Sequence, residues 1–188
     1  MTPRVDTVVK VGGALLSTPG ALDAVVRALE NSAARGLGLV IVPGGGPFAN
    51  AVRQIDASLG LGADAAHWMA ILAMDQHALL IASRTTHARL VEHPAEVTGA
   101  LVHGRLPVLA PYRWLRARDP LPHSWDVTSD SIAAWIGGEL DARRLVLVKP
   151  VVAEQAAMVD AYFERALPDG MRVVIADAAG LTEALRAT

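Results

Sequence analysis

The chain has 188 residues, of which 52% are hydrophobic and 19% charged, so it fits one compact domain with a sizeable core and not a disordered chain. The formal net charge of −2 gives no sign of a nucleic-acid or membrane-surface partner, and we expect neither. Because the chain has no cysteine, disulfides, thiolate metal sites and cysteine nucleophiles are excluded, and a cytoplasmic location is expected. The N-terminus shows no charged region followed by an apolar core, so no targeting segment is expected.

Strand-like and helix-like segments alternate along the chain. The expected strands are 5–11, 37–42, 86–90, 106–109, 144–148 and 171–175. The expected helices are 21–35, 47–58, 64–83, 130–140, 153–166 and 179–186. Strands such as "LGLVIV" and "RLVLV" are almost continuously apolar, which is typical of a mostly parallel sheet covered on both faces. The alternation therefore predicts an α/β layer sandwich. Between the fourth strand and the fourth helix, "PYRWLRARDPLPHSWDVTSD" is rich in proline and tryptophan and is interpreted as a long functional loop or hairpin, with an ordinary surface loop as the alternative.

Two glycine clusters follow the first two strands. "VGG" comes directly after Lys10, and "PGGGP" follows the second strand and opens a helix at Pro47. In an open α/β sheet, ligands bind beyond the carboxyl ends of the strands, where glycine lets backbone N–H groups approach an anion. Each loop alone is equally well explained as a tight connection. Together with Lys10, the pair favours a group that passes between two anions. Neither the Walker pattern nor the dinucleotide-binding glycine pattern is present.

A third motif, "WDVTSDSIAAWIGGEL", begins the fourth helix. Thr128 or Ser129 is a suitable N-cap, and Asp130 lies in the first turn, where the helix dipole favours a carboxylate. Asp130 is therefore either a capping acid or, considered with Lys10, a candidate for holding an ammonium group in place.

These three motifs, followed by "RLVLV", resemble the amino-acid kinase family, which includes aspartate, glutamate, acetylglutamate and uridylate kinases. The resemblance extends over residues 8–151. It implies an open three-layer αβα sandwich with a mainly parallel central sheet, and the use of ATP and magnesium. It also implies a single domain, 1–188, with an acceptor-binding part (1–128) and a shortened nucleotide-binding part (129–188).

The resemblance also implies roles for individual residues. Lys10 is expected to contact the transferring phosphoryl group, and Asp130 to orient the lysines. Gly12 and Gly13 are expected to donate backbone N–H groups to the phosphoryl, with Ser129 in the same phosphate-binding set. The second loop, Gly44, Gly45 and Gly46, is expected between the acceptor and the γ-phosphate.

The nucleotide half departs from the family pattern. Many relatives have Thr-Asp or Ser-Asp after the strand that follows the "SD" helix, where this chain has Lys149 and Pro150. Many also carry a later Gly-Gly-Met segment with a second phosphate-binding lysine, whereas Lys149 is the last lysine here. Either Lys149 has taken that role or the nucleotide half is degenerate.

Two aspartates are candidates for recognising a cationic acceptor. Asp75 lies on one helical stripe with Trp68, Ile71, Leu72 and Leu79, where a carboxylate is costly to bury unless it is paired. It therefore pairs either with an arginine, such as Arg53 or Arg84, or with the substrate. Asp126 is the second candidate, because the neighbouring Trp125 offers a face for an ammonium or a ring.

The remaining expectations concern His123, metals and assembly. His123 is a candidate contact for the acceptor phosphate, or else a loop histidine with a local hydrogen bond. The six histidines show no metal-ligand spacing, and no metal-binding residue is predicted. An apolar face of the third helix, Met69, Ala73 and Leu80, is a candidate contact in a homo-dimer or larger homo-oligomer.

The preferred function is an ATP-dependent small-molecule kinase. "AHWMAILAMDQHA" and "LPHSWDVTSDSIA" are similar to the small kinases of methanofuran biosynthesis, which phosphorylate [5-(aminomethyl)furan-3-yl]methyl phosphate to its diphosphate. The alternatives are a kinase for a carboxylate or another phosphate monoester, and a kinase-fold protein that binds an anion or nucleotide without turnover.

Overall fold

The computed structural model describes residues 4–150 and 159–186. Its centre is a six-stranded sheet in the order β3-β4-β2-β1-β5-β6, in which every strand pair is parallel. The strands are β1 (Thr7–Val11), β2 (Leu39–Pro43), β3 (Ala88–Val91), β4 (Leu106–Leu109), β5 (Arg144–Val148) and β6 (Arg172–Ala176). The predicted parallel α/β sandwich is confirmed, with strand boundaries shifted by at most two residues.

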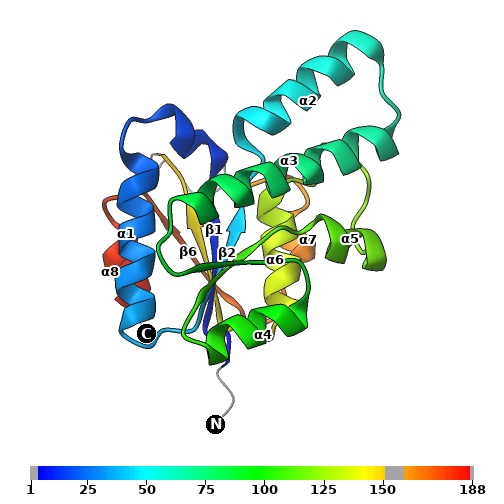
Figure 1. Cartoon of the computed structure of the whole chain (residues 1–188). Coiled ribbons are helices and arrows are strands. Elements are labelled where there is room, and N and C mark those ends of the chain that lie inside the picture. Colours follow the sequence, from blue (N-terminus) through cyan, green and yellow to red (C-terminus); the bar gives the residue numbers. More distant parts are fainter. Residues whose placement is uncertain (1–3, 151–158, 187–188) are drawn as a thin grey trace.

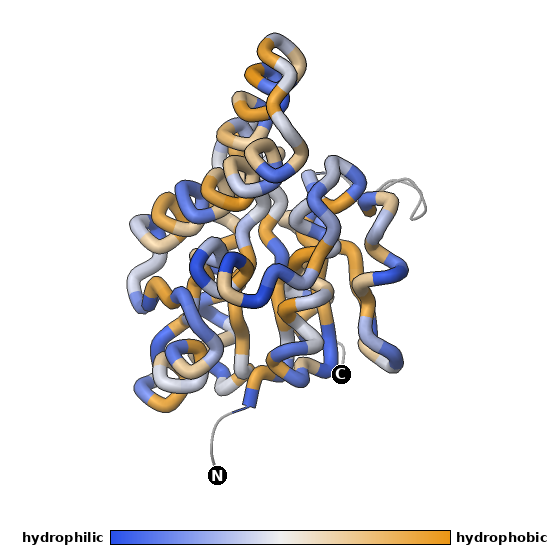
Figure 2. Tube along the Cα trace, turned by 90° about the vertical axis from the view of Figure 1, so that its right-hand side faces the viewer, coloured by the Kyte–Doolittle hydropathy of each residue, from blue (hydrophilic) through white to orange (hydrophobic). Residues whose placement is uncertain are grey.

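Helices cover both faces of the sheet (Figure 1). They are α1 (Ala21–Ala34), α2 (Gly46–Leu59), α3 (Ala63–Ser83), α4 (Pro94–Val102), α5 (Tyr112–Arg118), α6 (Ser129–Glu139), α7 (Phe163–Ala166) and α8 (Leu181–Arg186), with a short 3-10 turn, η1 (Gly13–Ser17). One core cluster joins the sheet to α1, α8 and the C-terminal part of α3, and the other joins it to α4, α5, α6 and α7. The central strands β1, β2 and β5 are therefore buried along their whole length, and hydrophobic residues predominate in the middle of the molecule (orange in Figure 2).

The stretch interpreted as a long loop is partly helical, which corrects the sequence prediction. Residues 112–118 form α5, directly after Pro111, which is compatible with the start of a helix. The structure also contains α4, which the sequence analysis did not predict. Of the helix predicted at 153–166, residues 153–158 lie outside the described part, and in the remainder only Phe163–Ala166 is helical.

The chain order places the site at one edge of the sheet. The chain builds β2, β3 and β4 on one side of β1 and then returns to the other side to form β5, so the strand order reverses beside β1. In open α/β sheets, ligands bind at such a reversal, beyond the carboxyl ends of the strands. At this edge α2 and the first half of α3 extend beyond the sheet as a neighbouring pair (Figure 1). Within the described residues, no helix is long and apolar enough to cross a membrane.

Candidate functional site

Two lysines converge on a single carboxylate at the carboxyl edge of the sheet. Lys10, near the end of β1, places Nζ 2.8 Å from Oδ1 of Asp130. Lys149, the first residue after β5, donates a hydrogen bond of 2.6 Å to Oδ2 of the same side chain. The parallel pairing sets Lys10 beside Leu147 on β5, which brings Lys149 to the same end. The structure therefore brings together the three residues predicted as the catalytic set.

Two of these three charges are almost completely buried, and the side chain of Lys149 is 14% exposed. Lys10 is 5% exposed and Asp130 is 4% exposed. Burial disfavours the charged carboxylate, but attraction by Lys10 and Lys149 outweighs it and lowers the pKa of Asp130. Burial also lowers the pKa of Lys10, against the attraction of Asp130. With both lysines protonated, the cluster has one net positive charge with little exposure to solvent, and a bound anion would balance this charge.

The two glycine loops meet beside this cluster. A Cβ on Gly13 would lie 2.1 Å from Cα of Gly46, which itself has a φ of +54°, so only glycine fits at this contact. A Cβ on Gly44 would lie 3.1 Å from Oγ of Ser129 and 3.3 Å from Cε of Lys10. The glycines therefore let two loops and the start of α6 close around the lysine.

One predicted backbone donor, Gly12, is occupied by another contact in the structure, and so is the N–H of Gly44 in the second loop. The N–H of Gly12 donates to the carbonyl of Val148 at 3.0 Å, and the N–H of Gly44 donates to the carbonyl of Val11 at 2.8 Å. Both groups are used in joining the strand ends, so neither is available for a phosphate in this arrangement. The glycines that line the cavity are Gly13, Gly45 and Gly46.

The start of α6 is fixed by a residue that the sequence analysis missed. Thr128 is the N-cap residue, but its own side chain does not cap the helix. Instead the carboxylate of Asp160 accepts hydrogen bonds from the backbone N–H of Thr128 at 2.9 Å and of Ser131 at 3.0 Å, and from both hydroxyls. Asp160 therefore satisfies one of the orphan N–H donors in the first turn of α6, that of Ser131, and holds the N-cap residue Thr128.

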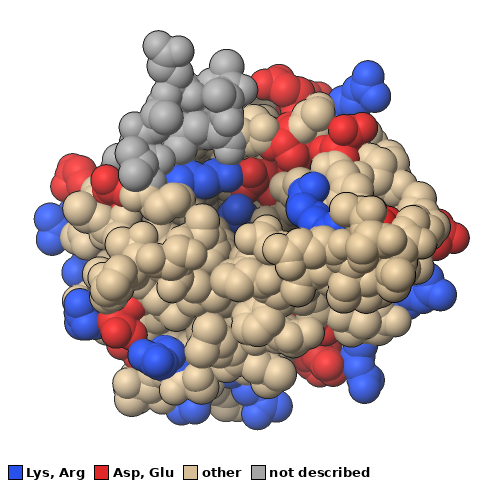
Figure 3. Space-filling model, turned by 90° about the horizontal axis from the view of Figure 1, so that it is seen from above, with Lys and Arg blue, Asp and Glu red and all other residues tan. Residues whose placement is uncertain are grey.

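A cavity of about 640 Å³ opens beside the lysines and extends between α2 and α3. Its phosphate-friendly end is formed by Lys10, Gly13, Gly45, Gly46, Ser129, Asp130 and Lys149. Seen from above, basic and acidic side chains lie together in a hollow within a mostly uncharged surface (Figure 3).

The other end of the cavity is built around Trp125. Its indole N–H donates a hydrogen bond of 2.7 Å to Oδ2 of Asp56, and the guanidinium of Arg53 lies 4.0 Å from its ring centroid. All three residues line the cavity. Trp125 was predicted as an acceptor contact, whereas Arg53 was considered only as a partner of Asp75 and Asp56 was missed. No local motif marks Asp56, because its partner lies 69 residues away in the chain.

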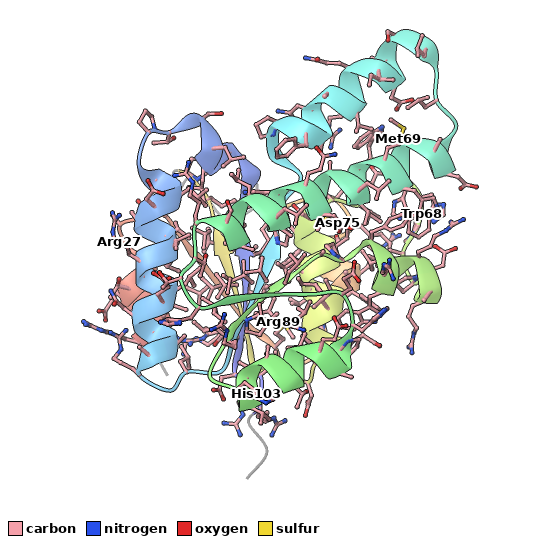
Figure 4. The ribbon with its side chains drawn as sticks, viewed as in Figure 1. Arg27, Trp68, Met69, Asp75, Arg89 and His103 are labelled. Carbon is pink, nitrogen blue, oxygen red and sulfur yellow. The ribbon has the colours of Figure 1, made fainter. Side chains whose placement is uncertain are left out.

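Neither aspartate predicted to bind a cation lies in the cavity, which corrects that expectation. Asp75 is half-buried near the middle of α3 (Figure 4), where it accepts a 3.1 Å hydrogen bond from the N–H of Tyr112. The arginines suggested as its partners are engaged elsewhere, Arg84 with Asp23 and Arg53 with Trp125. Burial raises the pKa of Asp75 to about 6, against the hydrogen bond from Tyr112.

Asp126 is exposed, and its backbone groups, not its carboxylate, form the hydrogen bonds that this residue makes in the described structure. Its N–H donates to Oγ of Ser124 at 3.1 Å, and its carbonyl accepts from the N–H of Tyr162 at 3.1 Å. Asp126 is not among the residues that line the cavity. Adjacency to Trp125 in the sequence therefore did not give adjacency in the site.

His123 lines the cavity, but both of its ring nitrogens have partners. Nδ1 lies 2.6 Å from Asp64 and Nε2 lies 2.8 Å from Asp119, while the ring stacks on His67 at 4.1 Å. Hydrogen bonding to Asp64 is the main cause of its raised pKa. His123 therefore fastens the segment before Trp125 to the start of α3, and the predicted contact with a phosphate would have to displace one of these carboxylates.

His77 is a buried residue beside the second glycine loop. Its Nδ1 lies 2.6 Å from the carbonyl oxygen of Gly44, and its Nε2 is buried without a hydrogen-bond partner in the described part of the chain. Burial lowers its pKa, which keeps the ring neutral and lets Nδ1–H donate to Gly44. The sequence could not assign this role, because no motif links His77 to Gly44, which lies 33 residues earlier in the chain.

Two further expectations concern metals and assembly. The described residues contain no group of three or more histidine or acidic side chains suited to hold a metal ion. On the predicted dimer face of α3, Ala73 is buried inside the chain. The exposed large apolar residues of this helix are instead Leu72 and Leu79. The predicted contact through Ala73 is therefore wrong, and the oligomeric state stays a prediction.

Comparisons with known proteins agree with this architecture. A family model described as "Amino acid kinase family" matches residues 7–152. A relative from Methanocaldococcus jannaschii, a [5-(aminomethyl)furan-3-yl]methyl phosphate kinase, is 32% identical over 145 residues. The match covers 77% of this chain but only 65% of that protein, just under two thirds of its length.

Two solved structures share the fold. Uridylate kinase from Archaeoglobus fulgidus has a TM-score of 0.73 at 15% identity, covering 97% of this chain and 96% of that one. UMP kinase from Bacillus anthracis has a TM-score of 0.68 at 12% identity, covering 98% of this chain and 91% of that one. At these identities the likeness establishes the fold alone.

Proposed function

Because the chain belongs to the amino acid kinase family, we propose that it transfers the γ-phosphoryl group of ATP to an anionic small molecule. The observation that carries this proposal is the buried cluster of Lys10, Lys149 and Asp130 beside two touching glycine loops. Two ammonium groups held by one carboxylate leave a positive charge for which a phosphoryl group is the natural partner. Phosphoryl transfer depends mainly on alignment and charge stabilisation, and two lysines beside glycine-rich loops are groups of the kind that supply both.

The proposed roles follow from position. Lys10 stabilises charge on the transferred phosphoryl, and Asp130 holds both lysines in place. Lys149 takes the role of the second phosphate-binding lysine that many family members carry later in the chain. Backbone N–H groups of Gly13, Gly45 and Gly46, with the Ser129 hydroxyl, complete the set of donors in the proposed phosphate site.

Magnesium fits this proposal as an ion carried by the nucleotide. Mg²⁺ keeps several water ligands and is commonly bound through phosphate oxygens, so it needs no dedicated cage of protein side chains. Asp130, the acid nearest the proposed phosphates, is occupied by two lysines. When bound, the ion would neutralise charge on the phosphates, while the lysines and backbone groups position them.

For the acceptor we propose [5-(aminomethyl)furan-3-yl]methyl phosphate, which becomes the diphosphate. The support is the relative of that name at 32% identity. The site also suits a phosphate acceptor chemically, since an ionised phosphate needs no general base to attack. In this proposal residues 1–128 bind the acceptor, residues 129–188 form a shortened nucleotide part, and the protein acts in the cytoplasm as a homo-oligomer.

The test is release of ADP from ATP and Mg²⁺ with a panel of acceptors. The panel contains the aminomethylfuran phosphate, UMP and a carboxylate such as N-acetylglutamate. We expect turnover with the furan phosphate and little with the others. A preference for UMP or the carboxylate would replace the acceptor and keep the phosphotransferase. Tight ATP binding without ADP release from any acceptor would instead support a binding protein.

A further inference from the structure

The cavity runs along one side of α2 from the glycine loop to Trp125. After Gly46 and Pro47 in the first turn, its lining residues on this helix are Ala49, Asn50, Arg53 and Asp56, which recur at intervals of one, three and three residues and so form a single stripe. The opposite wall comes from α3 and is mostly apolar, with Ala66, Ala70, Ile71 and Met74, although His67 on the same helix also lines the cavity. The cavity is therefore charged at both ends and mostly apolar along one side between them.

Asp56 is the acid at the far end of this cavity. The acids that line it are Asp130 and Asp56, and Asp130 is occupied by two lysines. Oδ2 of Asp56 accepts the indole N–H of Trp125, and among the described residues no cation lies within ion-pair distance of this carboxylate. Arg53, one turn earlier, has its guanidinium over the Trp125 ring instead.

From this arrangement we infer that Asp56 and Trp125 form a subsite for a cationic group at the end of the acceptor opposite its phosphate. The inference rests on the proposed kinase function and assigns the acceptor to one chemical class: a phosphate monoester with a flat apolar middle and a protonated amine. The ammonium group donates to the carboxylate of Asp56, and the apolar middle lies between Trp125 and the α3 wall. A carboxylate is the group that compensates an ammonium removed from water.

The span along α2 agrees with an acceptor of this size. Ten residues of helix from Gly46 to Asp56 correspond to about 15 Å of axis, and helical side chains lean back toward the N-terminus, which brings the Asp56 carboxylate somewhat closer to Gly46 than this. In [5-(aminomethyl)furan-3-yl]methyl phosphate, seven bonds of about 1.5 Å, bent along their path, join phosphorus to nitrogen. With a hydrogen bond of about 2.8 Å at each end, that reach covers most of this distance.

The experiment compares this compound with its des-amino analogue, (5-methylfuran-3-yl)methyl phosphate. Asp56→Asn keeps an oxygen to accept the Trp125 N–H but removes the charge, so the fold and the tryptophan position are retained. We expect kcat/KM for the aminated compound to fall about ten- to a hundredfold. The value for the des-amino compound and the KM for ATP should stay within about twofold of wild type. Asp126→Asn, an exposed control outside the cavity, should change neither.

Calorimetric binding of both compounds without ATP separates this inference from the kinase proposal. Tighter binding of the aminated compound by wild type, lost in Asp56→Asn, supports the subsite even if no ADP is released, and the missing turnover then counts against the kinase proposal. Equal affinity of wild type for the two compounds overturns the subsite. An unchanged preference in Asp56→Asn, with turnover intact, overturns it while the kinase proposal stands.

Discussion

Asp130 and Asp75 are both aspartates on largely apolar helices, but their surroundings differ. Asp130, in the first turn of α6, is 4% exposed and lies within 2.8 Å of two ammonium groups. Asp75, in the middle of α3, is half-buried and receives one backbone N–H. The pKa of Asp130 is lowered by its lysines, whereas burial raises the pKa of Asp75 to about 6.

The difference shows that partners decide what a buried acid does. Desolvation opposes the charge at both positions, and only at Asp130 is it outweighed. A carboxylate that stays charged can hold two lysines at a phosphate site. A carboxylate with a neutral donor is a cost to the fold at neutral pH. Substitution of each aspartate by asparagine should therefore have opposite effects on stability.

The largest effect is expected from Asp130→Asn. This change leaves Lys10 and Lys149 close together without their shared counter-charge, and breaking such a buried pair typically costs about 3–5 kcal/mol. We expect the free energy of unfolding in urea to fall by that order at pH 7. The loss should be smaller at pH 9.5, because burial and the neighbouring lysine lower the pKa of Lys10, which can then give up its proton. A stability equal to that of wild type at pH 7 would contradict the shared-carboxylate interpretation.

Lys10→Ala should have the next largest effect, and on rate more than on stability. Asp130 keeps Lys149 at 2.6 Å, so its charge remains compensated. Loss of one electrostatic contact to the reacting group typically lowers kcat by about 10²–10³. The measurement is steady-state kcat with saturating ATP and acceptor, together with the unfolding midpoint. Arg27→Ala, which removes an exposed cation on α1 (Figure 4), is the control and should leave kcat unchanged. A folded Lys10→Ala protein with normal kcat would refute the proposed mechanism.

The convergence of Lys10, Lys149 and Asp130 was predictable because its signals are local. Glycines directly after strands mark the carboxyl edge of a parallel sheet, and Lys10 stands just before such a pair, while Asp130 follows an N-cap signal at the start of a helix. Once the sheet is parallel, these segments must meet at one edge. The order of β1 and β5 then explains why Lys149 reaches the same carboxylate.

The acceptor end was not predictable in the same way. The helical stripe placed Asp75 beside the buried Ile71 but also included Leu72 and Leu79, which are exposed. The partner of Asp75 is the N-terminus of α5, an element that the proline-rich stretch did not reveal. No sequence pattern marks Asp56, because its hydrogen-bond partner, Trp125, comes from a segment 69 residues later in the chain. Contacts between distant segments that carry no shared motif require the three-dimensional packing.

Asp75→Asn should stabilise the protein at neutral pH. The folded pKa of about 6 exceeds the unfolded value of 3.8, so the folded state binds more protons between these values. Wild type therefore loses stability from this group as the pH rises from 4 to 7. Asparagine can still accept the Tyr112 N–H but carries no charge, so the variant avoids this loss. We expect its advantage to grow from near zero below pH 4 to roughly 1–3 kcal/mol above pH 7.

The measurement is urea unfolding of both proteins from pH 4 to pH 8, with the exposed Asp126→Asn as the control. Asp75→Asn should leave kcat and both KM values unchanged, because Asp75 is outside the cavity. An advantage independent of pH would show that the Asp75 carboxyl titrates in its usual range and that burial alone does not distinguish it from a surface acid.

The smallest effect is expected at a third carboxylate, Glu139 at the end of α6, which tests whether burial is needed at all. Glu139 forms an ion pair with Arg118 at 3.3 Å, but the two side chains are 30% and 60% exposed, so water already compensates both charges. Exposed pairs of this kind contribute about 0.2–1 kcal/mol and are screened by salt. Glu139→Gln should therefore lower the free energy of unfolding by less than about 1 kcal/mol. The loss should shrink further in 1 M NaCl, where the Debye length is about 3 Å.

The loss in Asp130→Asn should change much less with salt, because its pair is shielded from solvent. If Glu139→Gln costs as much as Asp130→Asn, or if both losses respond equally to salt, then pairing alone and not burial with pairing sets the contribution of these carboxylates.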